Sequence, residues 1–160
     1  MSDTLKTSVK PADVAEALKK TGYRASLVEH ERFPQVQSAA QGLGFFIGFG
    51  NAAVTDSASY IDYSFHCWIT IQGDLPAGLI DGWNQSKRFA RMYRQGQLLI
   101  LTMDVLVSGG VTENFLCAQV ELWDRIIHDF IRHLKQSAVR HAQAAQAAQA
   151  ANGAAGTAAA

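Results

Sequence analysis

The stretch Gly78–Phe115 reads GLIDGWNQSKRFARMYRQGQLLILTMDVLVSGGVTENF and predicts, in order, a helix, two strands and the start of a last helix. In its first part, apolar side chains recur at helical spacing at Leu79, Ile80 and Trp83. Asp74 lies in the turn before this helix. We expect Asp74 to cap the helix, because a carboxylate there can accept hydrogen bonds from the first-turn amides.

The pattern changes from a helical period to a period of two near Lys87 or Arg88. Gln95–Gly96 then predicts a hairpin turn, because glycine tolerates the positive φ that such turns need. The return strand, residues 97–107, is apolar on both faces in its first half, so we expect it to be covered on both sides there. Thr112 is the expected cap of the last helix.

Upstream of this stretch the chain predicts one helix and four strands. Pro11 opens the helix and Gly22 ends it. The segments with strand character are Tyr23–Glu29, Gln35–Ala40, Leu43–Phe49 and Tyr60–Ile71. The last of these alternates strictly, which predicts a central or paired strand with one buried face and one largely open face.

The glycines of residues 43–50 and the side chain of His66 allow predictions about what surrounds them. Gly44, Gly48 and Gly50 share one face of their strand, so we expect a helix, a second subunit or a ligand to pack closely over them. His66 lies on the open face of the next strand and is interpreted as a solvent-facing residue, without the partners that a metal site would need.

The last predicted helix carries a long apolar stripe and is expected to be the main cover of the sheet. From Ala138 the sequence becomes rich in alanine and glutamine and loses that stripe. We therefore divide the chain into a folded domain, residues 10–137, and a low-complexity tail, residues 138–160. Residues 141–160 are expected to be frayed or disordered, with Asn152-Gly153 stopping any helix, although a partner-binding helix is an alternative.

Composition predicts a single globular domain without a strong charge bias. Of 160 residues, 48% are apolar and 18% are charged, and 14 basic residues balance 14 acidic ones. A dedicated nucleic-acid binder usually shows a basic excess. The polar first ten residues and the lack of a long apolar run predict a cytoplasmic protein with no membrane partner. Cys67 and Cys117 are interpreted as buried free thiols, with a disulfide as the alternative.

The sequence contains no recognisable catalytic constellation. His128 and His133 are five residues apart on the last helix, whereas metal-binding pairs on one helical face are usually four apart, so both are expected to be solvated. No Cys-x-x-Cys, phosphate-loop, dinucleotide or nucleophile-elbow motif is present. We therefore predict no enzyme activity, no catalytic residue, no metal and no cofactor.

Basic and polar residues interleaved with aromatics are the strongest candidate site. The candidate ligand- or partner-binding residues are Trp83, Asn84, Arg88, Arg91 and Arg94. Such a cluster can bind phosphate or single-stranded nucleic acid. The alternative is structural: the aromatics fill the core, the asparagine bonds local backbone, and the arginines line one strand edge and its face.

An ordered set of residues resembles the YbjN family of small bacterial proteins. The set is Trp83-Asn84, Lys87-Arg88-Phe89, Asp104 and Gly109-Gly110-Val111. That family is labelled a putative sensory-transduction regulator and has a fold similar to type III secretion chaperones. The resemblance covers residues 10–135 and implies an α+β single domain, an antiparallel sheet packed by helices in the order α-β-β-β-α-β-β-α. The residues themselves favour three or four strands before the second helix.

The resemblance brings no established activity, and three hypotheses follow. The first is a non-enzymatic regulatory or chaperone-like domain that binds a protein or peptide, with a homodimer among the expected assemblies. A partner strand could add to an exposed sheet edge. The second is a nucleic-acid or phosphate-ligand binder that uses Arg88, Arg91 and Arg94. The third is an uncharacterised small enzyme.

Overall fold

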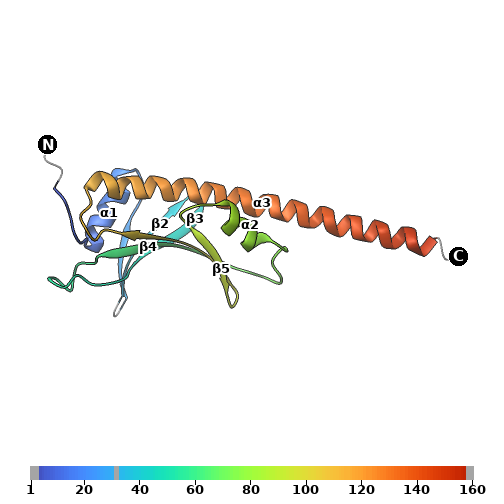
Figure 1. The fold of residues 1–160 in the computed structure, drawn as a ribbon, viewed down its shortest axis with the longest axis horizontal. Coiled ribbons are helices and arrows are strands. Elements are labelled where there is room, and N and C mark those ends of the chain that lie inside the picture. Colours follow the sequence, from blue (N-terminus) through green and yellow to red (C-terminus); the bar gives the residue numbers. More distant parts are fainter. Residues whose placement is uncertain (1–3, 31–32, 158–160) are drawn as a thin grey trace.

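A computed structural model describes residues 4–30 and 33–157, which form an α+β fold of one antiparallel sheet with helices along one of its faces (Figure 1). In chain order the elements are α1 (Pro11–Lys20), β1 (Ser26–His30), β2 (Phe33–Ala40), β3 (Leu43–Phe49), β4 (Asp62–Thr70), α2 (Leu79–Ser86), β5 (Arg91–Gln95), β6 (Leu98–Leu106) and α3 (Glu113–Thr157). The predicted fold class is confirmed. The chain has four strands before α2, one more than in the α-β-β-β-α-β-β-α order that the family resemblance implied.

The six strands of the described residues lie in the order β1-β2-β3-β4-β6-β5, and each pair of neighbours is antiparallel. The predicted central position of β4 is confirmed, because β4 pairs with β3 on one side and with β6 on the other. Strands β1 and β5 form the two edges. The fold thus has one edge at each end of the sheet where backbone groups could pair with another chain.

One face of the sheet is buried under the helices. The alternation of β4 places Tyr63, Phe65 and Cys67 on this face, where all three are buried. Trp123 of α3 stacks on Phe65 with ring centroids 5.2 Å apart and meets Phe45 at 5.9 Å. Burying one large apolar side chain stabilises a fold by roughly 1.5–3 kcal/mol. This layer of aromatic rings therefore anchors α3, the predicted main cover of the sheet.

The glycines of the third predicted strand are not covered by a helix. A Cβ atom at Gly48 would lie 3.6 Å from the His66 ring, and one at Gly50 would collide with the Asp62 carboxylate. A Cβ atom at Gly44 would meet nothing within 4 Å. Side chains of the neighbouring strand β4 therefore fill the space over two of these glycines, where a helix, a subunit or a ligand was expected.

Two predicted boundaries differ from the structure. The expected Asp74 cap is wrong: α2 begins at Leu79, after Gly78 at a φ of +77°, and no side chain caps it. Leu79 N–H instead donates to the Pro76 carbonyl at 3.2 Å, so a glycine turn sets the start of the helix. The hairpin turn falls at residues 96–97, one residue later than expected, with Gly96 at a φ of +58°.

The expectation of a frayed or disordered tail is also wrong. Helix α3 continues as one helix to Thr157, well past the sheet (Figure 1). Alanine and glutamine favour helix strongly enough to carry it through Asn152-Gly153. Ser137 is the last buried residue along α3, and residues 138–156 are exposed. The division into a domain, residues 10–137, and a tail stays a prediction.

None of the helices in the described ranges is both long enough and apolar enough to cross a membrane.

A chain that ends at Ala144 tests how far the core depends on the end of α3. Because the described residues among those removed, 145–156, are exposed, we expect the free energy of unfolding to change by less than about 0.5 kcal/mol. The magnitude of the negative ellipticity at 222 nm in circular dichroism should fall, since helical residues are lost. A chain that ends at Asp129, and so lacks the buried Phe130, is the control and should not fold stably. A loss of stability above about 1 kcal/mol in the first chain would show that the extension supports the core.

Candidate functional site

The junction between α2 and β5 holds two of the predicted site residues, and both bind backbone. Trp83 is buried and its indole Nε1 donates to the Ala90 carbonyl at 3.0 Å. Asn84 makes a two-point contact with Met92: its Nδ2 donates to the Met92 carbonyl at 2.8 Å, and its Oδ1 accepts the Met92 amide at 2.9 Å. The Asn84 amide therefore pairs with β5 as a neighbouring strand would.

This pairing has a consequence for the sheet. Asn84 and Trp83 belong to α2, so α2 satisfies the outer backbone groups of Met92 in β5 and the carbonyl of Ala90 just before it, which would otherwise be free. Their role here is structural, which is the alternative that the sequence left open for the candidate cluster.

The three candidate arginines do not share a site. Arg91 pairs with Asp104 on the open face of the sheet. Arg94 is three residues further along the same strand, on the opposite face, and its Nε donates to the Gly96 carbonyl at 3.0 Å. Arg88 lies in the α2–β5 connection over the Phe89 ring, 5.0 Å from its centroid. The structure thus separates the charges that a phosphate site on this strand would need together.

The open face of the sheet carries a cluster of aromatic rings. The Phe46 ring stacks on His66, and it meets Trp68 edge-on, with both pairs of centroids 4.9 Å apart. Ile100 lies between Trp68 and Tyr93 in the strand register and is buried, while Trp68 itself is half exposed. A half-exposed tryptophan beside other rings is typical of surfaces that receive a partner.

A polar network adjoins these rings. Asp104 accepts a hydrogen bond from Ser64 at 2.6 Å and pairs with Arg91. Burial alone would raise the pKa of Asp104, but these two partners hold it below its usual range. His66 Nδ1 lies 3.0 Å from the Thr102 hydroxyl. The His66 ring is half-buried rather than solvated as expected, and this burial lowers its pKa.

The β1 edge ends an apolar row that runs across the sheet. In the strand register Leu27 pairs with Val36, which continues to Ile47, Phe65 and Met103. The four inner members of this row are at most 2% exposed, whereas Leu27 is 50% exposed. No strand pairs with the outer side of β1 among the described residues. Sequence reasoning did not find this feature, because pairing partners cannot be read from one strand.

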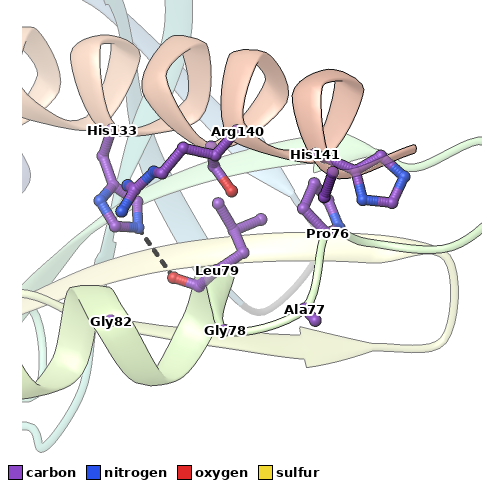
Figure 2. Close-up of a pocket in the computed structure, with 10 residues that line it drawn as sticks. Pro76, Ala77, Gly78, Leu79, Gly82, His133, Arg140 and His141 are labelled. Carbon is purple, nitrogen blue, oxygen red and sulfur yellow. Dashed lines mark hydrogen bonds between the residues drawn. The ribbon is translucent and has the colours of Figure 1, made fainter. Parts of the chain in front are cut away.

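A cleft of about 370 Å³ lies between the start of α2 and one face of α3 (Figure 2). His133 of α3 holds the two helices together: its Nε2 is 2.8 Å from the Leu79 carbonyl, and its ring meets Trp83 edge-on at 5.5 Å. A carbonyl only accepts, so Nε2 carries a proton. The expected solvated state of His133 is wrong, whereas His128 is exposed.

The α3 side of the cleft is one helical face. It presents His133, Ser137, Arg140, His141 and Ala144. These residues recur at steps of three and four, so the sequence contained the pattern, but only the fold shows that it faces α2.

The two cysteines are free thiols, with Cys67 buried and Cys117 partly buried. Burial raises the pKa of Cys67 to about 11 and also raises that of Cys117. A protonated, buried thiol is a poor nucleophile. Within the described ranges no three histidine, cysteine or acidic side chains gather as a metal site would require.

Comparison with known proteins identifies a family. The family model named YbjN, described as a putative bacterial sensory transduction regulator, matches residues 10–136. No curated protein and no solved structure matches the chain.

Replacing Asn84 tests its role as a strand substitute. Asn84→Ala removes two hydrogen bonds to Met92 and leaves those backbone groups on a strand edge, so we expect a loss of about 1–3 kcal/mol in the free energy of unfolding. The matched control, Gln85→Ala in the same exposed turn of α2, should change it by less than about 0.5 kcal/mol. Chemical denaturation measures both. Equal effects would contradict the assignment.

The pH dependence of folding stability tests whether the His66 ring is buried on the open face of the sheet. Burial lowers its pKa from the ordinary 6.5 in the folded chain, so the unfolded chain binds more protons between the two values. Stability is therefore expected to fall as the pH drops through 6.5 and to level off below the folded pKa, and His66→Gln should remove this component.

Nuclear magnetic resonance titration of the ring gives its pKa directly. Asp104→Asn should lower that pKa further, because the carboxylate raises it, and Asp81→Asn on α2 should leave it unchanged. A His66 pKa above 6.5 would be inconsistent with the buried ring.

Proposed function

The chain belongs to the YbjN family of putative bacterial sensory transduction regulators, and from this membership we propose that it is a non-enzymatic regulatory domain that binds a protein partner. The partner contributes an extended segment, which adds as a further strand along the outer edge of β1. Regulation then consists of holding or releasing that segment.

The observation that carries this proposal is the unfinished apolar row at β1. Val36, Ile47 and Phe65 are fully buried, and Leu27, the next residue outward, is half exposed. A strand placed beside β1 would set its own side chain next to Leu27 and continue the row. Burial of that apolar surface supplies part of the binding free energy.

Hydrogen bonds to the backbone of β1 supply a further part of the binding free energy. An edge strand presents unpaired N–H and C=O groups that an extended peptide can bond. At the other edge Asn84 of α2 occupies the Met92 backbone groups. The two edges therefore differ, and a partner strand is favoured at β1.

The expected partner segment is extended, with an apolar residue opposite Leu27 and polar residues in the alternate positions. A polar position fits beside Ser26, which flanks Leu27 on the open face and is exposed. We place this encounter in the cytoplasm, where free thiols such as Cys67 and Cys117 stay reduced. A second copy of the chain at the same edge would give a homodimer, and the test below separates the two occupants.

Peptides selected from a displayed library of extended sequences test the proposal. We expect bound peptides to protect the β1 amides from hydrogen exchange. Leu27→Lys should weaken binding at least tenfold, because a charge at the end of the row opposes strand addition. Leu106→Lys is the control: it changes another exposed leucine, far from β1 in the strand order, and should bind as the original chain does.

Two results would redirect the proposal. Peptides that bind Leu27→Lys normally, or that protect the β4 and β6 amides instead, would move the site to the open face. Light scattering that shows a dimer of the original chain and a monomer of Leu27→Lys would make a second copy the occupant of the edge.

A further inference from the structure

The side of α3 that is turned away from the sheet carries a line of basic side chains that ends at an apolar one (Figure 1). The members of this line recur at steps of three and four residues, which places them on one face of a helix. We call this surface the α3 basic stripe; it consists of Arg125, His128, Arg132, Lys135 and Val139, all exposed. On the opposite side of the helix, Trp123 and Phe130 are buried in the core. The stripe therefore faces solvent.

The charges of the stripe are largely left unpaired by the chain itself. Among the described residues, the basic side chains that form ion pairs are Lys6, Lys10, Lys20, Lys87, Arg91 and Arg132. Arg125 and Lys135 are in none of these pairs. The pair of Arg132 with Asp129 is long, at 3.6 Å, and exposed, so it contributes little stability. An external carboxylate can therefore compete for Arg132 and meet Arg125 and Lys135 without displacing a partner.

Positive charge is concentrated at this end of a chain that is neutral as a whole. The sequence has 14 basic and 14 acidic residues. After Asp129 it contains further arginine and lysine residues but no aspartate or glutamate. A surface with one sign of charge attracts a partner of the opposite sign and speeds the encounter.

Hollows beside the stripe add shape to this charge. One, of about 370 Å³, lies between α3 and the β2–β3 turn and is lined by Gln41, His128, Ile131, Arg132 and Lys135. The other, of about 510 Å³, is lined by Lys135, Gln136, Val139 and Arg140. Lys135 lines both, so the hollows follow one another along the helix. No acidic side chain of the described residues lines either of them.

The neighbours of the basic side chains favour a protein segment over a nucleic acid. Val139 is 56% exposed, and Ile131 in the first hollow is half-buried. Apolar contacts of this kind contribute to protein interfaces, whereas phosphate contacts dominate the affinity for nucleic acids. Glu121 lies on the same line one turn before Arg125, and Asp129 lies beside it. These carboxylates would repel a continuous phosphate backbone, but separate acidic side chains can be placed to avoid them.

From these features we propose that the α3 basic stripe binds an acidic segment of a partner protein, in which an apolar residue lies among aspartate or glutamate residues. The carboxylates pair with Arg125, Arg132 and Lys135, and each guanidinium group can hold a carboxylate by two parallel hydrogen bonds. The apolar residue packs on Val139. At about 1.5 Å per helical residue the stripe is about 21 Å long, which a helical segment of about 15 residues spans.

This surface shares no residue with the β1 edge, so it goes beyond the strand addition proposed above. It gives the chain a second contact in which the partner is selected by charge. Because the stripe is exposed to solvent, we expect its affinity to fall as salt is added.

The probe is a labelled helical peptide of about 15 residues with leucine on one face and glutamate on the flanking positions, and its fluorescence anisotropy is measured with the full chain. We expect saturable binding that weakens with added sodium chloride. The same peptide with glutamine in place of glutamate should not bind. Replacing Arg132→Gln together with Lys135→Gln should weaken binding about tenfold or more.

The matched control is Arg88→Gln together with Arg94→Gln. It removes the same amount of charge from exposed arginines outside the stripe and should bind as the original chain does. Val139→Ser should weaken binding about threefold, because apolar contact area is lost while the charge is unchanged. Leu27→Lys should not weaken it, which separates this proposal from strand addition at β1. Circular dichroism confirms that each variant is folded.

Several results would overturn the proposal. One is no saturable binding of the glutamate peptide, and another is equal weakening by the two double variants, which would reduce the effect to net charge. Tighter binding to a single-stranded DNA oligonucleotide or to phosphatidylserine vesicles than to the peptide would assign the stripe to a nucleic acid or to a membrane surface instead. A dimer in light scattering that Arg132→Gln with Lys135→Gln dissociates would assign it to a second copy of the chain.

Discussion

Packing of α3 on a single face of the sheet is the constraint from which the rest of the structure follows. Trp123 lies against Phe45 and Phe65, and further along the helix Phe130 meets Trp83 of α2 with centroids 5.9 Å apart. Because α1, α2 and α3 all bury apolar residues on this one side, the opposite face has no helix over it in the described ranges. The polar side chains of β4 and β6 that face away from the core are therefore available for local networks such as Ser64 with Asp104.

The open sheet has two edge strands, β1 and β5, and the side chains beside these two edges differ. A side-chain amide on α2 serves as a substitute strand for β5, with both donor and acceptor of Asn84 matched to Met92. An asparagine is suited to this role because its side chain carries the same pair of groups as a peptide bond. Strand β1 has no such cover, and its Leu27 remains half exposed. This asymmetry directs a partner strand to one edge rather than to both.

Because α3 is longer than the sheet, it also reaches the start of α2. After the helix leaves the sheet, the next turns pass the start of α2, and His133 fixes that approach through the Leu79 carbonyl. The glycine turn at Gly78 brings the uncapped end of α2 under the same helical face. Ser137 and Arg140 of α3 face the start of α2 there because both helices are anchored in the core by Trp83 and Phe130.

The sequence by itself determined the periodic elements. Strict alternation in residues 60–71 and the helical stripe from Leu116 to Leu134 report which side of each element is buried, and both signals are local. The family likewise followed from an ordered set of residues around Trp83-Asn84. The tertiary structure decided the roles of single polar side chains. Asn84 and His133 each depend on which backbone lies opposite. The helix that Asp74 was expected to cap begins after the glycine turn at Gly78, four residues later. Such contacts join residues whose distance in space no local pattern encodes, so the sequence left the partner edge and the cleft open until the fold brought their parts together.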